Sequence, residues 1–455
     1  MAKFATLVEF FVAAIERGSY RPGDALPSLR ATCTTQHVSM TTAKRAYHEL
    51  ERRGFIEALP RAGFRVVAGS VPSAAQPPLA AWGSPFVNPA LFDGRALARA
   101  AARALVDYPA ALAGLDAAGF VPLRRQLAQR YRAQGVALDW DQLIVTCGAM
   151  EALTLAVQLA TRGGPARLAV VVPAFPGLLG LLAQWGIAVL PLGLDAAGEL
   201  DLALLEREAA AGRVAGVAVM PTFQHPTGQC LSEAQQRALL DLAERHQLPI
   251  IEDDSYRELA LAGLAPPPMK ALDREGRVLY CAGSSKALAP GYRVGWLAAG
   301  RWHEAALQLK QSQTLASPLP SQLALAELLA GHGEVAALAG LRAALAKRLG
   351  AMRALLVERL PAGCGVSRPA GGYFLWLTLP TGFDIARLQQ AALAVGIHFA
   401  PGELCYPPGV PVAALRLNAS YYEPQSQADL LGWLADEIAR LASGAYSPMK
   451  RDSSL

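Results

Sequence analysis

Residues 283–296 read Gly-Ser-Ser-Lys-Ala-Leu-Ala-Pro-Gly-Tyr-Arg-Val-Gly-Trp and follow a short apolar run, residues 277–281, that predicts a strand. The segment places Lys286 among small residues and Arg293 seven positions later. A primary amine can condense with an aldehyde, and a guanidinium can bind a phosphate dianion through paired hydrogen bonds. Pyridoxal 5'-phosphate carries both an aldehyde and a phosphate, so the segment predicts a site for this cofactor.

Two other segments carry candidate contacts to the same cofactor. A strand over residues 142–146 leads through Gly148 into a helix, so the amides of Ala149 and Met150 would face the phosphate at the positive end of that helix. Residues 250–252 predict a buried strand that ends at Asp253, whose carboxylate would accept from a protonated pyridine nitrogen. Tyr256 would donate to the ring hydroxyl oxygen. Asp254, which follows Asp253, has helix capping as its alternative role.

An aromatic and a buried cation complete the predicted site. Phe175 follows the strand-like run 170–172 and is a candidate to stack on the pyridine ring, with an ordinary core position as the alternative. Arg416 lies inside the apolar strand pattern of residues 414–418, and a buried arginine usually has an anionic partner. In an amino-acid site that partner is the α-carboxylate of the substrate. Residues 371–376 predict the neighbouring strand.

Residues 1–68 form a separate, basic region that carries +4 of the net charge of +5. Helical patterns over residues 4–17, 28–35 and 40–53 are followed by a hairpin pattern over 54–59 and 64–67, and Ser28 and Ser39 are candidate helix caps. This order predicts a winged helix-turn-helix whose third helix enters the major groove of DNA by its N-terminal turn. A module that serves only dimerisation is the alternative.

The segment resembles the GntR winged-helix family through three motif blocks: Leu-Pro-Ser-Leu-Arg (26–30), Val-Ser-Met-Thr-Thr-Ala-Lys-Arg-Ala-Tyr (38–47) and Leu-Glu-Arg-Arg-Gly-Phe (50–55). Met40 departs from the family, which usually has a basic residue there. The resemblance implies contacts to DNA bases or phosphates by Arg30, Thr41, Thr42, Lys44 and Arg45 in the helices and by Arg61 and Gly63 in the wing.

The pieces between residues 100 and 440 resemble, in type and order, the fold-type I aminotransferase family. The resemblance implies that Lys286 binds the cofactor covalently and moves the proton, and that Asp253 pairs with the pyridine nitrogen. It also implies that Tyr256 donates to the ring oxygen, Arg293 holds the phosphate and Arg416 holds the substrate carboxylate.

Three departures from that family concern the cofactor site. His225 stands where the family has asparagine before Pro-Thr-Gly, and its charge would vary near neutral pH, although it can still donate to the ring oxygen. Gly283 stands where a hydroxyl is usual, so a phosphate contact depends on Ser284 or Ser285. Residues 114–117 read Gly-Leu-Asp-Ala and lack the tyrosine that reaches the phosphate of the partner subunit.

Composition agrees with a globular chain of several domains, because 53% of its 455 residues are hydrophobic and 17% are charged. We expect a Pro/Ala-rich linker over 69–90 and an α/β body with a mostly parallel sheet over 91–445. Within that body, a small C-terminal α+β subdomain covers about 335–445, and a tail follows over 446–455. The six scattered cysteines show no metal-ligand spacing, and no spanning helix or signal peptide is apparent, so we expect a cytoplasmic protein without a metal.

A winged helix joined by a linker to a fold-type I body resembles the MocR-type GntR regulators. This resemblance implies a homodimer that binds operator DNA and takes pyridoxal 5'-phosphate together with an amino acid or related amine as effector. The alternative is a working amino-acid aminotransferase with an appended DNA-binding module. A third hypothesis is a sensor that binds pyridoxal phosphate reversibly.

Overall fold

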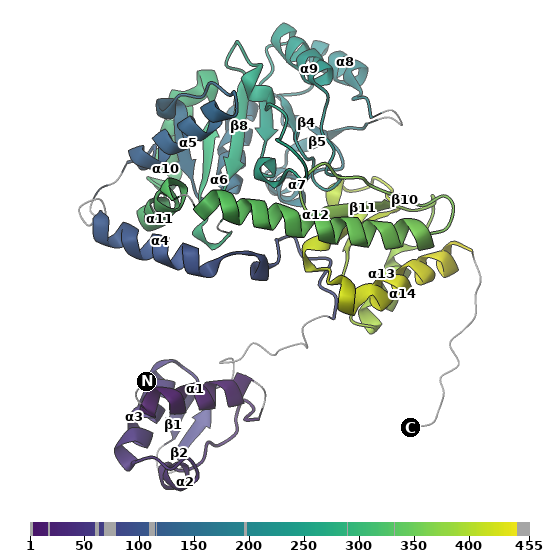
Figure 1. The fold of residues 1–455 in the computed structure, drawn as a ribbon. Coiled ribbons are helices and arrows are strands. Elements are labelled where there is room, and N and C mark those ends of the chain that lie inside the picture. Colours follow the sequence, from purple (N-terminus) through teal and green to yellow (C-terminus); the bar gives the residue numbers. More distant parts are fainter. Residues whose placement is uncertain are drawn as a thin grey trace. The chain divides into compact units, whose positions relative to one another are not determined.

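The computed structural model describes residues 3–16, 19–59, 63–67, 79–108, 114, 116–194, 198–288, 290–331 and 333–443. The chain divides into two compact units, Met1–Pro78 and Leu79–Leu455 (Figure 1). Arg61, the first part of the expected linker (69–78) and the expected tail (446–455) lie outside the described residues.

The N-terminal unit has the predicted elements of a winged helix-turn-helix. Ser28 and Ser39 each accept a hydrogen bond from the amide three residues later, which confirms both expected helix caps. The Tyr47 hydroxyl is fully buried and donates to the Pro27 carbonyl at 2.7 Å, so the third helix is fixed to the turn before the second. The elements are α1 (Lys3–Glu16), α2 (Leu29–Thr35), α3 (Met40–Arg52), β1 (Ile56–Leu59) and β2 (Gly63–Val66).

A seven-stranded sheet in the order β3-β9-β8-β7-β6-β4-β5 forms the centre of the second unit. Its pairs from β8 to β5 are all parallel, and β9 runs antiparallel to both of its neighbours. The predicted, mostly parallel sheet is therefore confirmed. The strands are β3 (Leu143–Thr146), β4 (Arg167–Val171), β5 (Ala188–Leu192), β6 (Val217–Val219), β7 (Ile250–Asp253), β8 (Val278–Gly283) and β9 (Gly295–Ala298).

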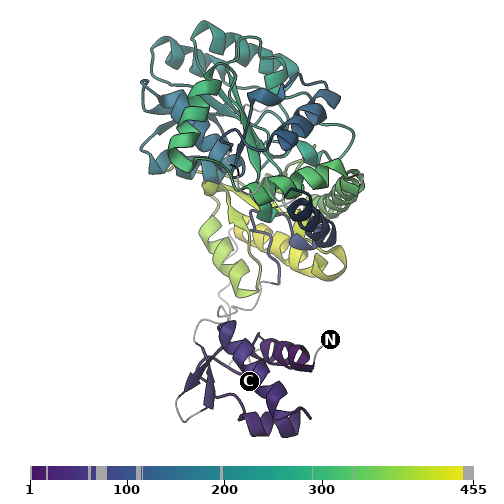
Figure 2. The same cartoon turned by 90° about the vertical axis from the view of Figure 1, so that its left-hand side faces the viewer.

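Helices cover both faces of this sheet (Figure 2). Alternate residues of each strand enter two different apolar clusters, one on each face, which explains why the strands are apolar almost throughout. The helices are α4 (Gly94–Asp107), α5 (Val121–Ala133), α6 (Ala149–Thr161), α7 (Pro176–Gln184), α8 (Leu202–Ala210), α9 (Glu233–Arg245), α10 (His303–Thr314) and α11 (Leu319–Ala330).

A small subdomain follows, built on a four-stranded antiparallel sheet in the order β10-β11-β13-β12. As predicted, the strand of Arg416 pairs with the strand that follows Gly371 and Gly372. The long helix α12 passes both the central sheet and this subdomain (Figure 1). The elements are α12 (Gly333–Arg359), β10 (Gly365–Val366), β11 (Phe374–Thr378), α13 (Ile385–Ala394), β12 (Ala400–Pro401), β13 (Ala414–Asn418) and α14 (Pro424–Ala442).

The expected linker over 69–90 is wrong in its second half. Residues 79–88, here called the strap, pack against the small subdomain, with Trp82 fully buried in its core. Ala80 forms a parallel bridge to Ile397, and the Trp82 carbonyl accepts from the Asn418 amide at 2.7 Å. A proline- and alanine-rich composition predicted an exposed spacer, but one large aromatic side chain anchors this segment instead.

Among the described residues, no single helix is long and apolar enough to cross a membrane. One pair, Leu319–Ala330 with Val335–Arg359, meets the criteria of length and composition only when its two helices are joined across a 90° bend.

Candidate functional site

A pocket of about 770 Å³ opens beside the C-terminal ends of β7 and β8. Parallel sheets place ligand-binding groups at this edge, because loops and helix N-termini meet there. Most of the predicted cofactor residues line this one pocket, although they come from segments up to 144 residues apart. They are Ala149, Met150, Phe175, Asp253, Ser285, Lys286 and Arg293.

One end of the pocket is suited to a phosphate. The Arg293 guanidinium donates from Nη1 to Ser285 Oγ at 2.9 Å, and no side chain caps the N-terminus of α6. A Cβ on Gly148 would lie 2.5 Å from Arg293 Nη2, so only glycine lets the guanidinium approach this helix end. Arg293 has a positive φ of 52°, a costly backbone conformation for this residue type. The Arg293 guanidinium, the Ser285 hydroxyl and the first amides of α6 therefore lie together at this end of the pocket.

The two serines before Lys286 have different surroundings. Ser284 is buried, and its Oγ donates to the Val294 carbonyl at 3.0 Å, whereas Ser285 lines the pocket. A Cβ on Gly283 would lie 3.2 Å from the Ala149 amide nitrogen, so the glycine keeps the helix end open. Ser285 is therefore the hydroxyl available to replace the one absent at position 283.

Lys286 and Asp253 both line the pocket. Lys286 Nζ lies 5.9 Å from the Phe175 ring centre and donates to the Pro85 carbonyl at 3.3 Å. Burial raises the pKa of Asp253, while two hydrogen bonds from Ser255 and the charge of Lys286 act in the opposite direction. Both Ser255 bonds reach Oδ1, which leaves Oδ2 for a cationic donor in the pocket.

Behind the pocket, a hydrogen-bonded chain joins Arg416, His225 and Tyr256. Arg416 Nη1 lies 3.2 Å from His225 Nε2, and His225 Nδ1 lies 3.1 Å from the Tyr256 oxygen. Because a guanidinium can only donate, Nε2 accepts, and Nδ1 carries the proton and donates to Tyr256. The Tyr256 hydroxyl hydrogen is then directed at Tyr373, its second hydrogen-bond partner.

His225 differs from the sequence-based expectation in two respects. Burial, with the charges of Arg416 and Lys286, lowers its pKa well below the usual value, so the imidazole is neutral near pH 7. Both ring nitrogens already have protein partners, so the expected direct donation to the cofactor ring is not available to it. In this arrangement His225 acts through Tyr256.

Arg416 is 4% exposed, and none of the described carboxylates forms an ion pair with it. Its Nη2 donates to the Gly83 carbonyl at 2.8 Å, and its Nε has no hydrogen-bond partner among the described residues. Burial lowers the pKa of this guanidinium from its usual value, although it stays charged. An arginine held this way is suited to an anionic ligand, because its desolvation is only partly offset.

The strap supplies contacts that the sequence analysis missed. Pro85 and Phe86 line or face the pocket, and Tyr373 donates to the Pro85 carbonyl at 3.0 Å. The Asn418 amide group donates to the carbonyls of Ser84 and Phe86 at 2.9 and 2.7 Å. The available signal was Trp82, because a tryptophan within a proline-rich run indicates burial.

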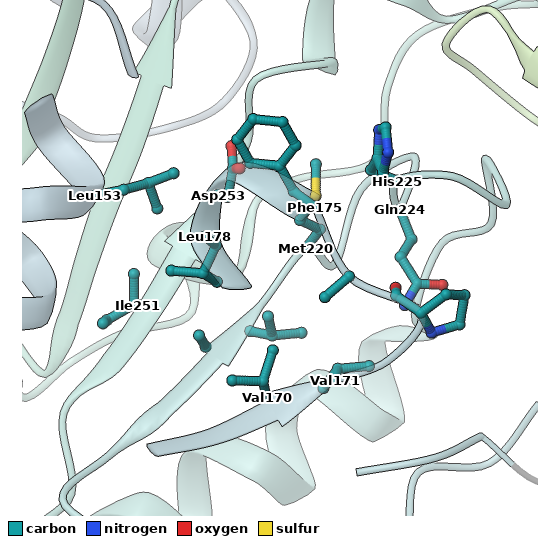
Figure 3. Close-up of a pocket in the computed structure, with 14 residues that line it drawn as sticks. Leu153, Val170, Val171, Phe175, Leu178, Met220, Gln224, His225, Ile251 and Asp253 are labelled. Atoms are coloured by element: carbon teal, nitrogen blue, oxygen red, sulfur yellow. The ribbon is translucent and has the colours of Figure 1, made fainter. Parts of the chain in front are cut away.

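A second, inner crevice lies beneath Phe175, and Figure 3 shows Phe175, Asp253 and His225 at its rim above strand residues such as Val170 and Ile251. Its volume of about 10 Å³ has room for no more than one water molecule. The crevice therefore belongs to the packing under the ring of Phe175, not to a ligand site.

The opposite face of β7 carries a different polar network. Asp254 Oδ2 accepts from the Tyr280 hydroxyl at 2.7 Å and from Arg257 at 3.2 Å, which places Asp254 in a buried cluster and not at a helix cap. The Tyr131 hydroxyl lies 2.9 Å from the Tyr280 oxygen and donates to it, because the single Tyr280 hydrogen is directed at Asp254. Burial raises the pKa of Asp254 to about 6. Asp253 therefore lines the pocket, while Asp254 next to it belongs to a buried cluster on the opposite face.

In the N-terminal unit, most of the predicted DNA-contacting residues are exposed. Arg30, Thr41 and Lys44 are exposed, and no described carboxylate lies within ion-pair distance of either cation. Thr42 is instead half-buried and bonds Ser39 at the helix cap, while the Arg45 guanidinium lies 4.3 Å from the Phe4 ring centre. Gly63 begins β2 with a φ of 91°.

Comparisons with known proteins agree with both units. Residues 88–421 match the family of class I and II aminotransferases, and residues 7–66 match the gntR family of bacterial regulatory proteins. The chain is 32% identical to the uncharacterized HTH-type transcriptional regulator YdcR of Escherichia coli, over 89% of this chain and 92% of that protein.

Two enzymes are similar to the second unit. Aromatic-amino-acid aminotransferase 1 of Thermococcus litoralis is 31% identical, over 73% of this chain and 79% of the enzyme. The crystal structure of a multiple substrate aminotransferase from Thermococcus profundus has a TM-score of 0.75 at 25% identity, and the match covers 82% of this chain and 94% of that one.

These aminotransferases depend on pyridoxal 5'-phosphate, and the pocket fits that cofactor. The left-handed Arg293 at the uncapped end of α6 matches its phosphate, and the amine of Lys286 matches its aldehyde. The chain therefore belongs to the pyridoxal phosphate-dependent class I and II aminotransferase family and carries a GntR-type DNA-binding domain at its N-terminus, the organisation of MocR-type transcriptional regulators.

Proposed function

We propose that this protein is a transcriptional regulator that binds operator DNA through its N-terminal unit and responds to an amino compound bound with pyridoxal phosphate. One observation carries the proposal: a pocket equipped for the cofactor and a helix-turn-helix with exposed cations occur on one chain. The full-length similarity to a transcriptional regulator supports the same assignment.

In this proposal the cofactor's phosphate is held by Arg293, Ser285 and the first amides of α6, and its pyridine nitrogen faces Asp253. When bound, pyridoxal phosphate supplies an aldehyde that exchanges amine partners and a ring that withdraws electrons from them. Lys286 is the protein's own amine for that exchange, and Phe175 covers one side of the ring.

The remaining residues would orient the effector. Arg416 offers a buried fork for a carboxylate, and the neutral His225 holds that fork in place through Nε2. Tyr256 accepts a hydrogen bond from His225 Nδ1, and on exchanging its Tyr373 partner it can direct its own hydrogen toward the ring oxygen. An effector that matches both the cofactor aldehyde and the Arg416 guanidinium is a primary amine that also carries a carboxylate.

The DNA-binding step uses the N-terminal turn of α3. Lys44 and Arg30 are exposed and positioned near the capped starts of the two helices, which suits contacts to phosphates, while Thr41 faces solvent for base contacts. The half-buried Thr42 is better suited to holding the helix cap. The stacked position of Arg45 on Phe4 requires that it rotate away before it reaches DNA.

We also propose that the protein works as a homodimer. The pocket is open on one side, and the exposed Val106 and Leu315 are 75% and 67% accessible, an unfavourable exposure for apolar side chains in a monomer. A two-fold dimer would present two recognition helices to a palindromic operator. Sedimentation of the full-length protein at micromolar concentration tests this assignment, with a monomer as the contradicting result.

The test of the regulatory function is a DNA-binding titration. Full-length protein is titrated into DNA from upstream of its own gene, with and without pyridoxal phosphate and with a panel of amino acids. We expect one amino compound to change the DNA affinity by at least about fivefold. No effect of any compound, with cofactor bound, would contradict the proposal.

A working aminotransferase is the second candidate, because Lys286 and Asp253 are both in place beside an arginine fork. Incubation with amino acids and 2-oxo acids distinguishes the two. Sustained turnover above about 1 per second would favour the enzyme.

A further inference from the structure

The strap is attached to the small subdomain at its N-terminal end. Trp82 is fully buried against Tyr422, with ring centres 6.0 Å apart. Ala80 donates to the Gly396 carbonyl at 3.1 Å and accepts from the His398 amide at 2.9 Å. Gln427 in α14 holds both the Leu79 carbonyl, at 2.7 Å, and the Trp82 indole nitrogen, at 3.3 Å.

The other end of the strap accepts hydrogen bonds from Lys286 in the pocket and from two residues behind it. Its carbonyl at Pro85 accepts from Lys286 at 3.3 Å and from Tyr373 at 3.0 Å, and its carbonyl at Gly83 accepts from Arg416 at 2.8 Å. A Cβ on Gly83 would lie 3.0 Å from the backbone of Phe399, so the strap lies as close to the residue before β12 as a glycine permits.

These contacts connect the small subdomain to Lys286 through the strap. It begins at residue 79, where the second unit starts directly after the unit that carries the helix-turn-helix. It is fixed to the subdomain that contains Arg416, and its Pro85 carbonyl reaches Lys286 in the loop that follows β8. A ligand that binds the same donor hydrogens of these two cations competes with those carbonyls.

We propose that the strap couples ligand binding to DNA binding. A carboxylate bound at Arg416 replaces the Gly83 carbonyl and loosens residues 83–86. This change alters the start of the second unit, which follows the DNA-binding unit in the chain. The inference rests on the proposed function and adds to it the part of the chain that moves and the ligand group that moves it.

The geometry of Arg416 explains why a carboxylate is the effective group. Its Nε lacks a partner among the described residues, while Nη2 is taken by Gly83. A carboxylate that binds Nε and Nη2 as a pair competes directly with the Gly83 carbonyl, and a charged acceptor makes the stronger hydrogen bonds. The two strap arrangements then differ in affinity for the ligand, as coupling requires.

A pair of stable cofactor analogues tests this on full-length, cofactor-free protein. Phosphopyridoxyl-L-alanine and phosphopyridoxyl-ethylamine differ by one carboxylate. We expect both to bind, and the alanine adduct alone to raise amide hydrogen exchange at Ser84 and Phe86 by about tenfold or more. Equal exchange with both bound analogues would overturn the coupling proposal alone. Failure of both to bind would overturn the proposed function and this inference with it.

A variant outside the pocket tests the link to DNA. Gln427→Ala removes the strap's contacts at Leu79 and Trp82, together with the bond from the Glu423 amide at the start of α14, and touches no pocket residue. We expect analogue affinity within about twofold of wild type, and the effect of the alanine adduct on DNA affinity to fall from at least about fivefold to below about twofold. The exposed Gln425→Ala on the same helix is the matched control and keeps the full effect. An unchanged effect in Gln427→Ala would overturn the proposal.

Discussion

The N-terminal unit and the ligand pocket both depend on cations, but the two regions hold them in opposite surroundings. Lys44 and Arg30 are exposed, whereas Arg416 is 4% exposed and bonded to His225 and a backbone carbonyl. Water and salt screen the first kind of charge, so it gives affinity without orientation. The second kind has a fixed direction, and its interaction energy depends on the few acceptors that its buried N–H groups reach.

Among the substitutions that test this contrast, we expect Lys286→Ala to have the largest effect, which is on cofactor binding. We expect Lys286→Ala to lose all visible absorbance from bound pyridoxal phosphate, because no other described lysine lines the pocket. Lys270 is the control, since it bonds Asp273 and the Val278 carbonyl, each at 2.9 Å, away from the pocket. A normal spectrum in Lys286→Ala would show that another amine carries the cofactor.

The next effect is at Arg416. Wild-type protein should prefer phosphopyridoxyl-L-alanine over phosphopyridoxyl-ethylamine, and Arg416→Met should reduce that preference by about 2–3 kcal/mol, the value of paired hydrogen bonds to a charged group. Titration calorimetry at low and high salt measures it. If the preference weakened with salt as DNA binding does, the buried and exposed cations would not differ as described.

A smaller effect concerns buried charge outside the pocket. The pKa of Asp254 is raised to about 6 from an ordinary 3.8, so its contribution to stability is complete below pH 3.8 and is lost as pH rises through 6. Asp254→Asn should therefore gain stability relative to wild type by about 1–3 kcal/mol between pH 4 and pH 7. Urea unfolding at each pH measures the difference, and a constant difference would contradict the raised pKa.

The smallest effect is at an exposed cation. Lys44→Ala should lower the salt slope of DNA binding by about one unit, which corresponds to a three- to fourfold change between about 50 and 200 mM salt. Arg52→Ala is the control, because Arg52 lies at the far end of α3 and pairs with Glu49 at 2.7 Å. An unchanged slope in Lys44→Ala would argue against a phosphate contact there.

Local patterns predicted a large part of this architecture. The serine caps at positions 28 and 39, the strand that ends at Asp253 and the lysine loop after β8 each depend on a few consecutive residues. Short-range geometry determines them, so residue type and spacing are sufficient signals. The strap was missed because its burial depends on β12, β13 and α14, which lie more than 300 residues away.

The sequence by itself determined the two-part organisation, the family and the identity of the groups that suit pyridoxal phosphate, because motifs and periodicity are local properties. Only the tertiary structure decided how those groups are partnered. It showed that His225 is neutral and bonded at both nitrogens, that Ser285 faces the pocket while Ser284 does not, and that the strap's carbonyls occupy Lys286 and Arg416. Protonation and hydrogen-bond partners depend on burial, and burial arises when distant segments pack together.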